Sequence, residues 1–438
     1  MIGKRSVMFH EALDRAIEAI RAHWDLLGPK VVVVRDLRGR LRVVLPEKTD
    51  KDLAPFVTDW TEKLGAYGYP AVSAVLFAED LMEGEALFAR DNPDRRLLVE
   101  EGDRRIWLLD RQLIGADWTR AVKAPESKVK RVTFYSIKGG VGRSTALALW
   151  AWWLARGGRH VLVFDVDLES PGVSSLLLPE EHLPEFGIVD WFVEDSVGQG
   201  DVVVDRMTAA SPLALDLPGS IQVVPAYGTD TGDYLPKLAR CYLEPAGTGG
   251  AHWADRLRRL TEALEEREEP DVVLLDSRAG IHDIAAVLIH RMDADALLFG
   301  VESSQTWRAY SFLFRHWRTH PLVRQFRTRF QMVAGMVPET NREVYIERFT
   351  ERSWDLFREN LYDDEEPSNA HADNPEVFSF DLHEPDAPHY PLPIFWSRAL
   401  QELEPAGPGG LDEQAVEGAM GQFLPEAERW LFGGEEDT

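Results

Sequence analysis

Cysteine is almost absent from this 438-residue chain, which contains only Cys241. A single cysteine excludes an internal disulfide, a CxxC redox pair and a cysteine-rich metal site, so its expected role is packing. Runs of 18 apolar residues are also absent, and no membrane-spanning helix is expected. An amphipathic pattern follows the N-terminal residues MIGKRSVMFHEAL. We therefore expect no signal peptide and predict a cytoplasmic location.

Positive charge is scarce relative to negative charge. The chain has 48 Lys and Arg residues against 74 Asp and Glu residues, which gives a formal net charge of −26. An acidic surface repels nucleic acids and anionic lipids at long range, so non-specific binding to either is disfavoured. No membrane binding is expected at the C-terminus, because the stretch 411–431 has one basic residue, Arg429, and five acidic ones: Asp412, Glu413, Glu417, Glu426 and Glu428.

The pattern of the chain predicts three parts. Residues 1–125 combine a helical apolar face over 8–26 with two hairpin signals, at 31–45 and 95–110, which indicates an α+β domain with a docking or regulatory role. A polar stretch with Pro125 forms the linker to residues 126–400, where continuous apolar runs alternate with helical segments. This alternation predicts an α/β fold with a doubly wound, mostly parallel sheet. Residues 401–438 are expected to form a C-terminal helix over 411–431 and an acidic tail.

Seven strands are expected in the second part, with an apolar helix at 144–158 buried against the sheet and ended by Gly157 and Gly158. The acidic stretch 363–376 is expected to be an insertion loop. The expected strands are 131–136, 160–167, 221–227, 271–277, 294–302, 331–337 and 393–397.

The sequence SIKGGVGRST (136–145) follows the first of these strands and opens the apolar helix. Glycines at 139, 140 and 142 let backbone N–H groups approach an anion, and the helix N-terminus adds a partial positive charge. Ser144 is placed to offer a hydroxyl to Mg²⁺. The alternative is a glycine-rich turn without a ligand. Three aspartates at strand ends, Asp165, Asp167 and Asp276, favour the phosphate-binding interpretation over simple capping or solvation of those ends.

These motifs resemble the ParA/MinD-type P-loop ATPases with a deviant Walker A loop, over residues 130–400. KGGVGRST is similar to the loop of that family, VLVFDVDLESPG (161–172) to the segment after its second strand, and VVLLDSRAGI (272–281) to its Walker B strand and switch. The resemblance implies binding of ATP and Mg²⁺ and a homodimer that closes on ATP. No NKxD or TKxD motif for guanine is present, which also favours ATP.

The resemblance also implies a role for each residue. Lys138 would reach the nucleotide of the partner subunit, and Asp167 would help to hold the attacking water. Asp165 would support the Mg²⁺ shell, and Asp276 would reach Mg²⁺ through water. Arg278 stands where the family has proline. Nucleotide contacts are expected from Gly139, Gly140, Val141, Gly142, Arg143, Ser144 and Thr145. Similar loops occur in ParA-like proteins of bacterial multi-gene conflict or signalling systems and in partition-like systems.

Arg143 occupies the position at which such loops normally carry lysine. Arginine is always charged and can contact phosphate through two nitrogens, but it is longer and planar. A displacement of about 1 Å can cost about 100-fold in rate. We therefore expect nucleotide binding with slow hydrolysis.

Residues 303–338 contain no Asp or Glu but six arginines with interleaved aromatic residues. This composition fits a surface for nucleic acid or an acidic partner. The alternative is a solvated helix face whose aromatic residues pack inward, with the arginines near the acidic stretch 363–376. The arginines are Arg308, Arg315, Arg318, Arg324, Arg327 and Arg329, and the aromatics are Trp307, Phe314, Trp317, Phe326 and Phe330.

Two functions remain open from the sequence. The first is a weakly hydrolysing ATPase that acts as a nucleotide-dependent dimerisation switch, with the N-terminal domain coupling its state to a partner protein. The second is a non-catalytic scaffold or adaptor that binds nucleotide for structure alone. The presence of Lys138, Asp167 and Asp276 together favours the first, because a scaffold has no chemical need of them.

Overall fold

The computed structural model describes residues 6–82, 84–90, 92, 94–112, 115–243, 252–364, 377–400, 406 and 410–433. The chain forms two compact units, Met1–Val122 and Lys123–Thr438. These units are defined by compactness alone, so the functional division at 125/126 and 400/401 stays a prediction. Among the described residues, no helix is both long enough and apolar enough to cross a membrane.

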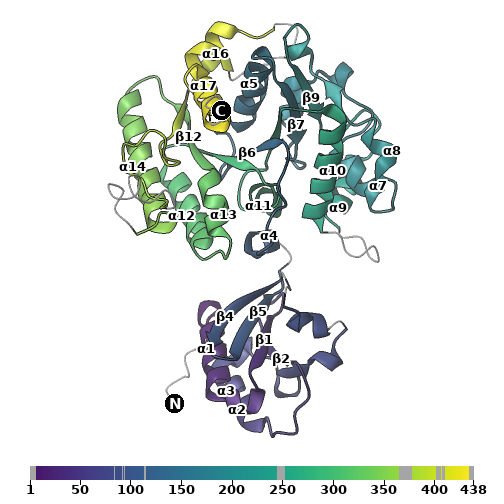
Figure 1. The fold of residues 1–438 in the computed structure, drawn as a ribbon, viewed down its shortest axis with the longest axis vertical. Coiled ribbons are helices and arrows are strands. Elements are labelled where there is room, and N and C mark those ends of the chain that lie inside the picture. The colour runs from purple at the N-terminus through teal and green to yellow at the C-terminus, as the bar shows by residue number, and fades with distance from the viewer. Residues whose placement is uncertain are drawn as a thin grey trace. The chain divides into compact units, whose positions relative to one another are not determined.

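The first unit is built on a five-stranded mixed sheet (Figure 1). Both predicted hairpins are present, and parallel pairing of β1 with β5 joins them into one sheet. In sheet order the strands are β3 (Val75–Phe77), β2 (Leu41–Leu45), β1 (Lys30–Arg35), β5 (Arg104–Asp110) and β4 (Arg95–Glu101).

Helices cover one face of this sheet. α1 (Phe9–Ala22) and α3 (Ala54–Leu64) bury Ile20 and Trp60 against Val31 and Val33 of β1, whereas Val32 and Val34 point to a smaller apolar cluster on the opposite face. This alternation is the period of two that a strand imposes. The helix predicted over 8–26 is interrupted at His23, after which the short α2 (Trp24–Leu27) begins.

The second unit contains an eight-stranded sheet in which every pairing is parallel except that of the edge strand β8. All seven predicted strands are present, and β8 was not predicted. In sheet order the strands are β13 (Leu392–Phe395), β12 (Phe330–Val337), β11 (Asp295–Gly300), β6 (Lys130–Ser136), β10 (Val272–Asp276), β7 (His160–Asp165), β9 (Ser220–Val224) and β8 (Ala209–Ala210).

Helices lie on both faces of this sheet (Figure 1). On one face, α5 (Arg143–Arg156), α16 (Glu413–Met420) and α17 (Phe423–Phe432) pack on side chains such as Phe134. On the other face, α7 (Ile188–Asp195), α10 (Trp253–Glu268) and α11 (Asp283–His290) pack on side chains such as Phe164. The remaining helices are α4 (Ala116–Thr119), α6 (Val173–Leu177), α8 (Gly200–Val204), α9 (Tyr234–Cys241), α12 (Ser304–Arg318), α13 (Val323–Phe326) and α14 (Arg342–Asn360).

The prediction of one C-terminal helix over 411–431 is wrong, because two helices separated at Gly421 and Gln422 take its place. Glycine has a low helix propensity, and a Cβ on Gly421 would lie 2.5 Å from the backbone oxygen of Glu417. Both helices join the core that contains α5, so this segment completes one layer of the fold. The acidic residues 365–376 and 434–438 lie outside the described residues.

Candidate functional site

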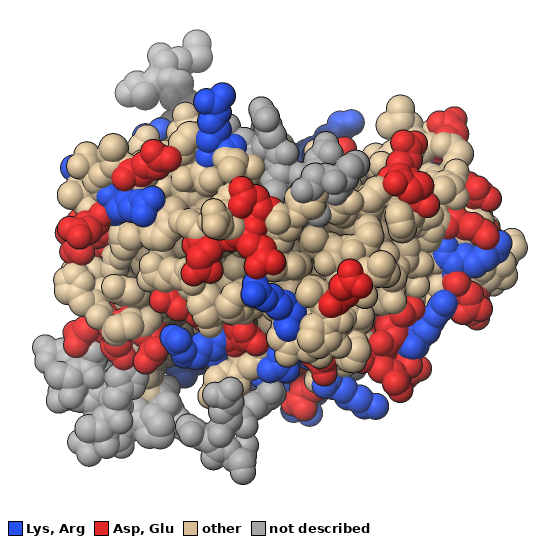
Figure 2. Space-filling model, turned by 90° about the horizontal axis from the view of Figure 1, so that it is seen from above, with Lys and Arg blue, Asp and Glu red and all other residues tan. Residues whose placement is uncertain are grey.

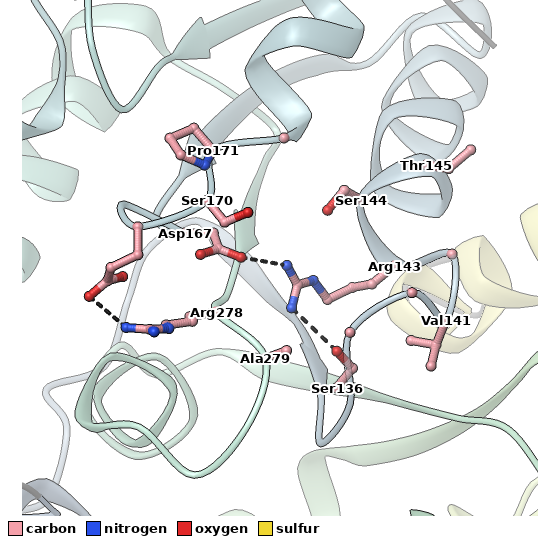
Figure 3. Close-up of a pocket in the computed structure, with 15 residues that line it drawn as sticks. Ser136, Val141, Arg143, Ser144, Thr145, Asp167, Ser170, Pro171, Arg278 and Ala279 are labelled. Atoms are coloured by element: carbon pink, nitrogen blue, oxygen red, sulfur yellow. Dashed lines mark hydrogen bonds and ion pairs between the residues drawn. The ribbon is translucent and has the colours of Figure 1, made fainter. Parts of the chain in front are cut away.

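A cavity of 570 Å³ lies where the neighbouring strands β6, β10 and β7 end (Figure 3). The cavity is within the size range of small-molecule sites. One side is lined by 136 and 139–145, the other by 167, 169–172 and 278–279. In a parallel sheet the carboxyl ends of all strands meet at one edge, which brings the three predicted motifs together here.

The glycine-rich loop presents backbone amides to this cavity. Gly140 and Gly142 have φ angles of 74° and 83°, which glycine adopts without strain. Gly142 is the N-cap of α5, and no side chain caps the helix, so the first amide groups of α5 have no side-chain acceptor. A Cβ on Gly139 or Gly140 would meet no atom within 4 Å. The loop therefore offers open, amide-lined space with the character of an anion site.

Strand β12 packs closely against the glycine loop. A Cβ on Gly335 would lie 2.5 Å from the backbone oxygen of Val141, so only glycine lets the strand approach so closely. Met336 has a φ of 56°, which is uncommon for a residue with a side chain, and its Sδ lies 3.8 Å from where a Gly142 Cβ would be. Val141 itself is buried in the core. The sequence did not predict this support.

Arg143 points from the start of α5 into a cluster of carboxylates. Its Nε donates to Asp276 Oδ1 at 2.7 Å, its Nη2 to Asp167 Oδ2 at 3.2 Å, and its Nη1 to Ser136 Oγ at 3.3 Å. The side chain is only 8% exposed. Burial disfavours the charge of Arg143, but the carboxylates of Asp276 and Asp167 outweigh this effect and raise its pKa. All three guanidinium nitrogens are thus bonded to protein.

Burial raises the pKa of all three aspartates. The pKa of Asp165 rises to about 7, because it is fully buried and close to the charge of Asp276, although Ser174 donates to it through both its amide and its hydroxyl. The pKa values of Asp276 and Asp167 also rise through burial, and Arg143 opposes both shifts. Burial is the largest cause of each rise, so ionisation of these carboxyl groups costs free energy that a bound cation would offset.

The donor set fits a cation such as Mg²⁺ bound with phosphate. Ser144 Oγ donates to Asp276 Oδ2 at 2.8 Å, so these two predicted ligands adjoin. The Oδ1 atoms of Asp165 and Asp167 are buried and have no hydrogen-bond partner in the described ranges. Oxygen ligands of this kind suit Mg²⁺, which usually takes the rest of its shell from phosphate and water. Among the described residues, no group of three or more His, Cys, Asp or Glu side chains is arranged to hold a metal alone.

Two predicted residues lie at the edge of this arrangement. Lys138 is exposed and does not line the cavity, and its predicted reach to a partner subunit stays a prediction. Thr145 is partly buried and lines the cavity beside Ser144. Cys241 lies in the core, where burial raises the pKa of its thiol to about 12, in keeping with packing.

Sequence reasoning did not assign two charged residues that line the cavity. Arg278 Nη1 lies 2.6 Å from Glu169 Oε1, and Tyr242 donates its hydroxyl to the same oxygen at 2.8 Å. The sequence contained a signal for this pair, because two loops after adjacent strands carry opposite charges close behind Asp167 and Asp276. Ser174, which holds Asp165, had no comparable signal.

Five aromatic residues of 303–338 are not available for stacking on bases, whereas Phe312 is 57% exposed and lies beside Arg315. Trp307, Phe314, Trp317, Phe326 and Phe330 are all buried, as the alternative interpretation expected. Arg327 is buried too, and it forms two hydrogen bonds with Asp363, the first residue of the acidic stretch. The exposed members define what we call the arginine surface: Arg308, Arg315, Arg318 and Arg324.

Charge on the rest of the molecule follows the acidic composition. Figure 2 shows one face on which Asp and Glu side chains form several groups, with Lys and Arg between them. The coloured residues on that face form no continuous patch of Lys and Arg side chains. Attraction of a polyanion to that face would therefore have to come from a local surface.

Comparison with known proteins identifies the domain. Residues 132–304 match the family model "CobQ/CobB/MinD/ParA nucleotide binding domain". No curated protein matches the chain. Similar solved structures include pNOB8 ParA bound to nonspecific DNA, which is 14% identical, with 71% of this chain and 100% of that chain covered and a TM-score of 0.44.

Two further structures are similar to a comparable degree. A Cyanothece McdA–ATP complex is 17% identical, with 71% of this chain and 96% of that chain covered and a TM-score of 0.41. The MinC:MinD cell division complex of Aquifex aeolicus is 16% identical, with coverages of 69% and 95% and a TM-score of 0.41. Since every TM-score is below 0.5, these similarities add no information about function. Residues 132–304 thus belong to the CobQ/CobB/MinD/ParA nucleotide-binding domain family, and an additional N-terminal sheet domain precedes them.

Proposed function

We propose that this protein binds ATP with Mg²⁺ in the cavity at the end of β6 and hydrolyses it slowly. The amides of the glycine loop and of the first turn of α5 would contact the phosphates, and Ser144 and Asp276 would hold Mg²⁺, which neutralises phosphate charge when bound. Asp165, opposite Asp276 on the adjacent strand, would support the Mg²⁺ shell. Asp167 lines the cavity and would help to hold the attacking water.

Slow hydrolysis follows from the contacts of Arg143. Its guanidinium is bonded to Asp167 and Asp276, the two carboxylates that would orient water and the metal. Arg143 opposes the rise in the pKa of Asp167 that burial causes, so Asp167 accepts a proton less readily than it would without this ion pair. These contacts are the observation that carries the proposal.

The nucleotide state would control a homodimer. Lys138 is exposed at the cavity-side loop, and in a closed dimer it would approach the nucleotide of the partner subunit. Closure would therefore depend on bound ATP, and hydrolysis would reopen the dimer. The N-terminal domain would connect this cycle to a partner protein, in a partition-like or multi-gene conflict system.

A scaffold that binds nucleotide without turnover is the competing function. Phosphate release from ATP by wild type, Lys138→Ala and Asp167→Ala separates the two. The switch predicts a low rate in wild type that falls to background in both variants. Equal background rates in all three proteins contradict hydrolysis. Mass in solution with and without Mg·ATP tests the dimer separately, and an unchanged monomer mass contradicts the switch.

Nucleic-acid binding is a second candidate, favoured by the arginine surface. α12 presents three exposed arginines, and the exposed Arg324 follows on α13. Because most aromatic residues of this segment are buried, most contacts would be to the phosphate backbone, so binding would be largely independent of sequence and sensitive to salt.

A further inference from the structure

Two positively charged side chains line the cavity, and they differ in burial and in the number of their bonds to the protein. Figure 3 shows Arg143 extending from the start of α5 towards Asp167, and Arg278 extending away from Arg143 towards its ion-pair partner. Arg143 is 8% exposed and bonded through all three nitrogens. Arg278 is 36% exposed and has one carboxylate partner, Glu169. Arg278 is therefore the guanidinium that can meet an incoming anion without the loss of buried ion pairs.

Glu169, the ion-pair partner of Arg278, has a further hydrogen bond on the same oxygen. Glu169 Oε1 accepts from Tyr242 as well as pairing with Arg278, so it keeps a hydrogen bond if the arginine leaves. Its second oxygen, Oε2, is buried and has no partner among the described residues. An ion pair at a partly exposed position contributes little stability, so the cost of separating it is small.

The position of Arg278 determines which part of a bound nucleotide its side chain would contact. The glycine loop lies on the wall formed by 136–145, and loops of this type surround the inner phosphates. Arg278 lies on the opposite wall, in the loop between β10 and α11. A triphosphate is longer than a diphosphate by one phosphoryl group, and with the inner phosphates at the glycine loop that group would be the part of the nucleotide nearest to Arg278.

We propose that Arg278 exchanges Glu169 for the terminal phosphate of bound ATP and so gives the site its preference for a triphosphate over a diphosphate. The inference rests on the proposed nucleotide binding in this cavity. It gives a role to the residue that stands where similar proteins have proline, which has no group to contact phosphate. The exchange also links the bound nucleotide to the loop that carries Asp167, because Glu169 lies two residues further along that loop.

Calorimetric titration of the full chain with Mg²⁺ and either ADP or a non-hydrolysable ATP analogue tests this exchange. Arg278→Gln removes the charge and should weaken the analogue about tenfold or more, but ADP less than about threefold, since a hydrogen bond to a charged group contributes roughly 1.5–3 kcal/mol. Glu169→Gln removes the competitor for Arg278 and should strengthen binding of the analogue while ADP is unchanged. Opposite signs for the two partners are the signature of exchange.

Matched controls come from a second exposed ion pair, Arg206 with Glu185, which does not line the cavity. Arg206→Gln and Glu185→Gln should leave both affinities unchanged. Equal effects of Arg278→Gln on both ligands, or no effect, overturn the proposal. Weaker analogue binding in Glu169→Gln also overturns it, because the pair would then be a structural support. If Arg278→Gln does not fold, the Glu169→Gln result decides alone.

The same titration separates this inference from the function on which it rests. Wild-type protein that binds neither ligand refutes nucleotide binding in the cavity altogether. Wild-type protein that binds the analogue, with Arg278→Gln unchanged, refutes only the role of Arg278. Arg278→Lys keeps the charge but not the planar fork, and analogue affinity between those of wild type and Arg278→Gln supports a direct phosphate contact.

Discussion

Asp276 on β10 lies directly opposite Asp165 on β7 in the register of two parallel strands. Both side chains are fully buried, and within the described part of the chain only Arg143, Ser144 and Ser174 supply hydrogen bonds to them. Two carboxyl groups in such a position repel each other and raise the cost of ionisation. This cost is the physical basis of the expected affinity for a divalent cation and of the first prediction.

Stability should fall as the pH rises from about 4 to about 7. The pKa of Asp165 is about 7 in the folded protein against 3.8 in the unfolded chain, so between these values only the folded state keeps the proton. Asp165→Asn removes this dependence. The free energy of unfolding, measured in urea over this range, should decline in wild type relative to the variant by up to a few kcal/mol, since one pKa unit corresponds to about 1.4 kcal/mol.

The difference between the two proteins is the readout for Asp165, because other groups titrate in the same range. Burial raises the pKa of Asp295 to about 6 and lowers that of His389 to about 4, and both remain in the variant. Parallel curves for wild type and Asp165→Asn contradict the raised pKa. Addition of Mg·ATP should reduce the difference, since a bound cation favours the ionised carboxylate.

Arg143→Lys should accelerate hydrolysis while ATP binding is kept. A shorter ammonium cannot bond Asp167, Asp276 and Ser136 together, so Asp167 becomes available to water. We expect kcat to rise at least several-fold, in a steady-state phosphate-release assay. Arg156→Lys, an exposed change near the far end of the same helix, is the control and should leave kcat unaltered. A rate equal to or below that of wild type shows that Arg143 does not restrain Asp167.

Gly335→Ala should displace the glycine loop and weaken nucleotide binding. The added Cβ would lie 2.5 Å from the backbone oxygen of Val141, a distance that requires the loop or β12 to move. We expect at least a tenfold loss of ATP affinity by calorimetry, consistent with the sensitivity of such sites to displacements of about 1 Å. Gly418→Ala in α16 is the control, because a Cβ there meets no atom within 4 Å. Unchanged affinity in Gly335→Ala contradicts support of the loop by β12.

The arginine surface predicts salt-dependent binding of duplex DNA in the presence of ATP. Replacement of Arg308, Arg315 and Arg318 by Gln should lower the slope of log affinity against log salt by up to about 2.7, at about 0.9 per lost phosphate contact. The matched control replaces Arg348, Arg352 and Arg358 of α14, where acidic residues alternate with the basic ones. Absence of wild-type binding at about 50 mM salt contradicts a nucleic-acid role for this surface.

Most of the second unit could be predicted from the sequence because each strand is a continuous apolar run ended by a motif. The run before Ser136 and the glycines after it determine a strand, a loop and a helix in that order. The edge strand β8 was missed because two residues, Ala209 and Ala210, give no periodic signal. The C-terminal helix was predicted too long because amphipathic spacing continues across Gly421, where the backbone separates two helices.

Within the candidate site, residue types were easier to predict than contacts. The sequence indicated that Arg143 carries charge near phosphate, but its bonds to Asp167 and Asp276 depend on strand register. Gly335 and Val141 approach closely although they are about 200 residues apart in the sequence, and packing between such distant segments leaves no local sequence pattern. The roles of the predicted site residues themselves stay predictions.

Calorimetric titration of the wild-type chain with Mg·ATP, followed by thermal melting at saturating ligand, tests nucleotide binding most directly. A ligand that binds only the folded state stabilises it by about 2.7 kcal/mol at 100 times its Kd, so we predict a binding heat and a clear increase in Tm. Absence of heat together with an unchanged Tm would contradict the phosphate site at the end of β6.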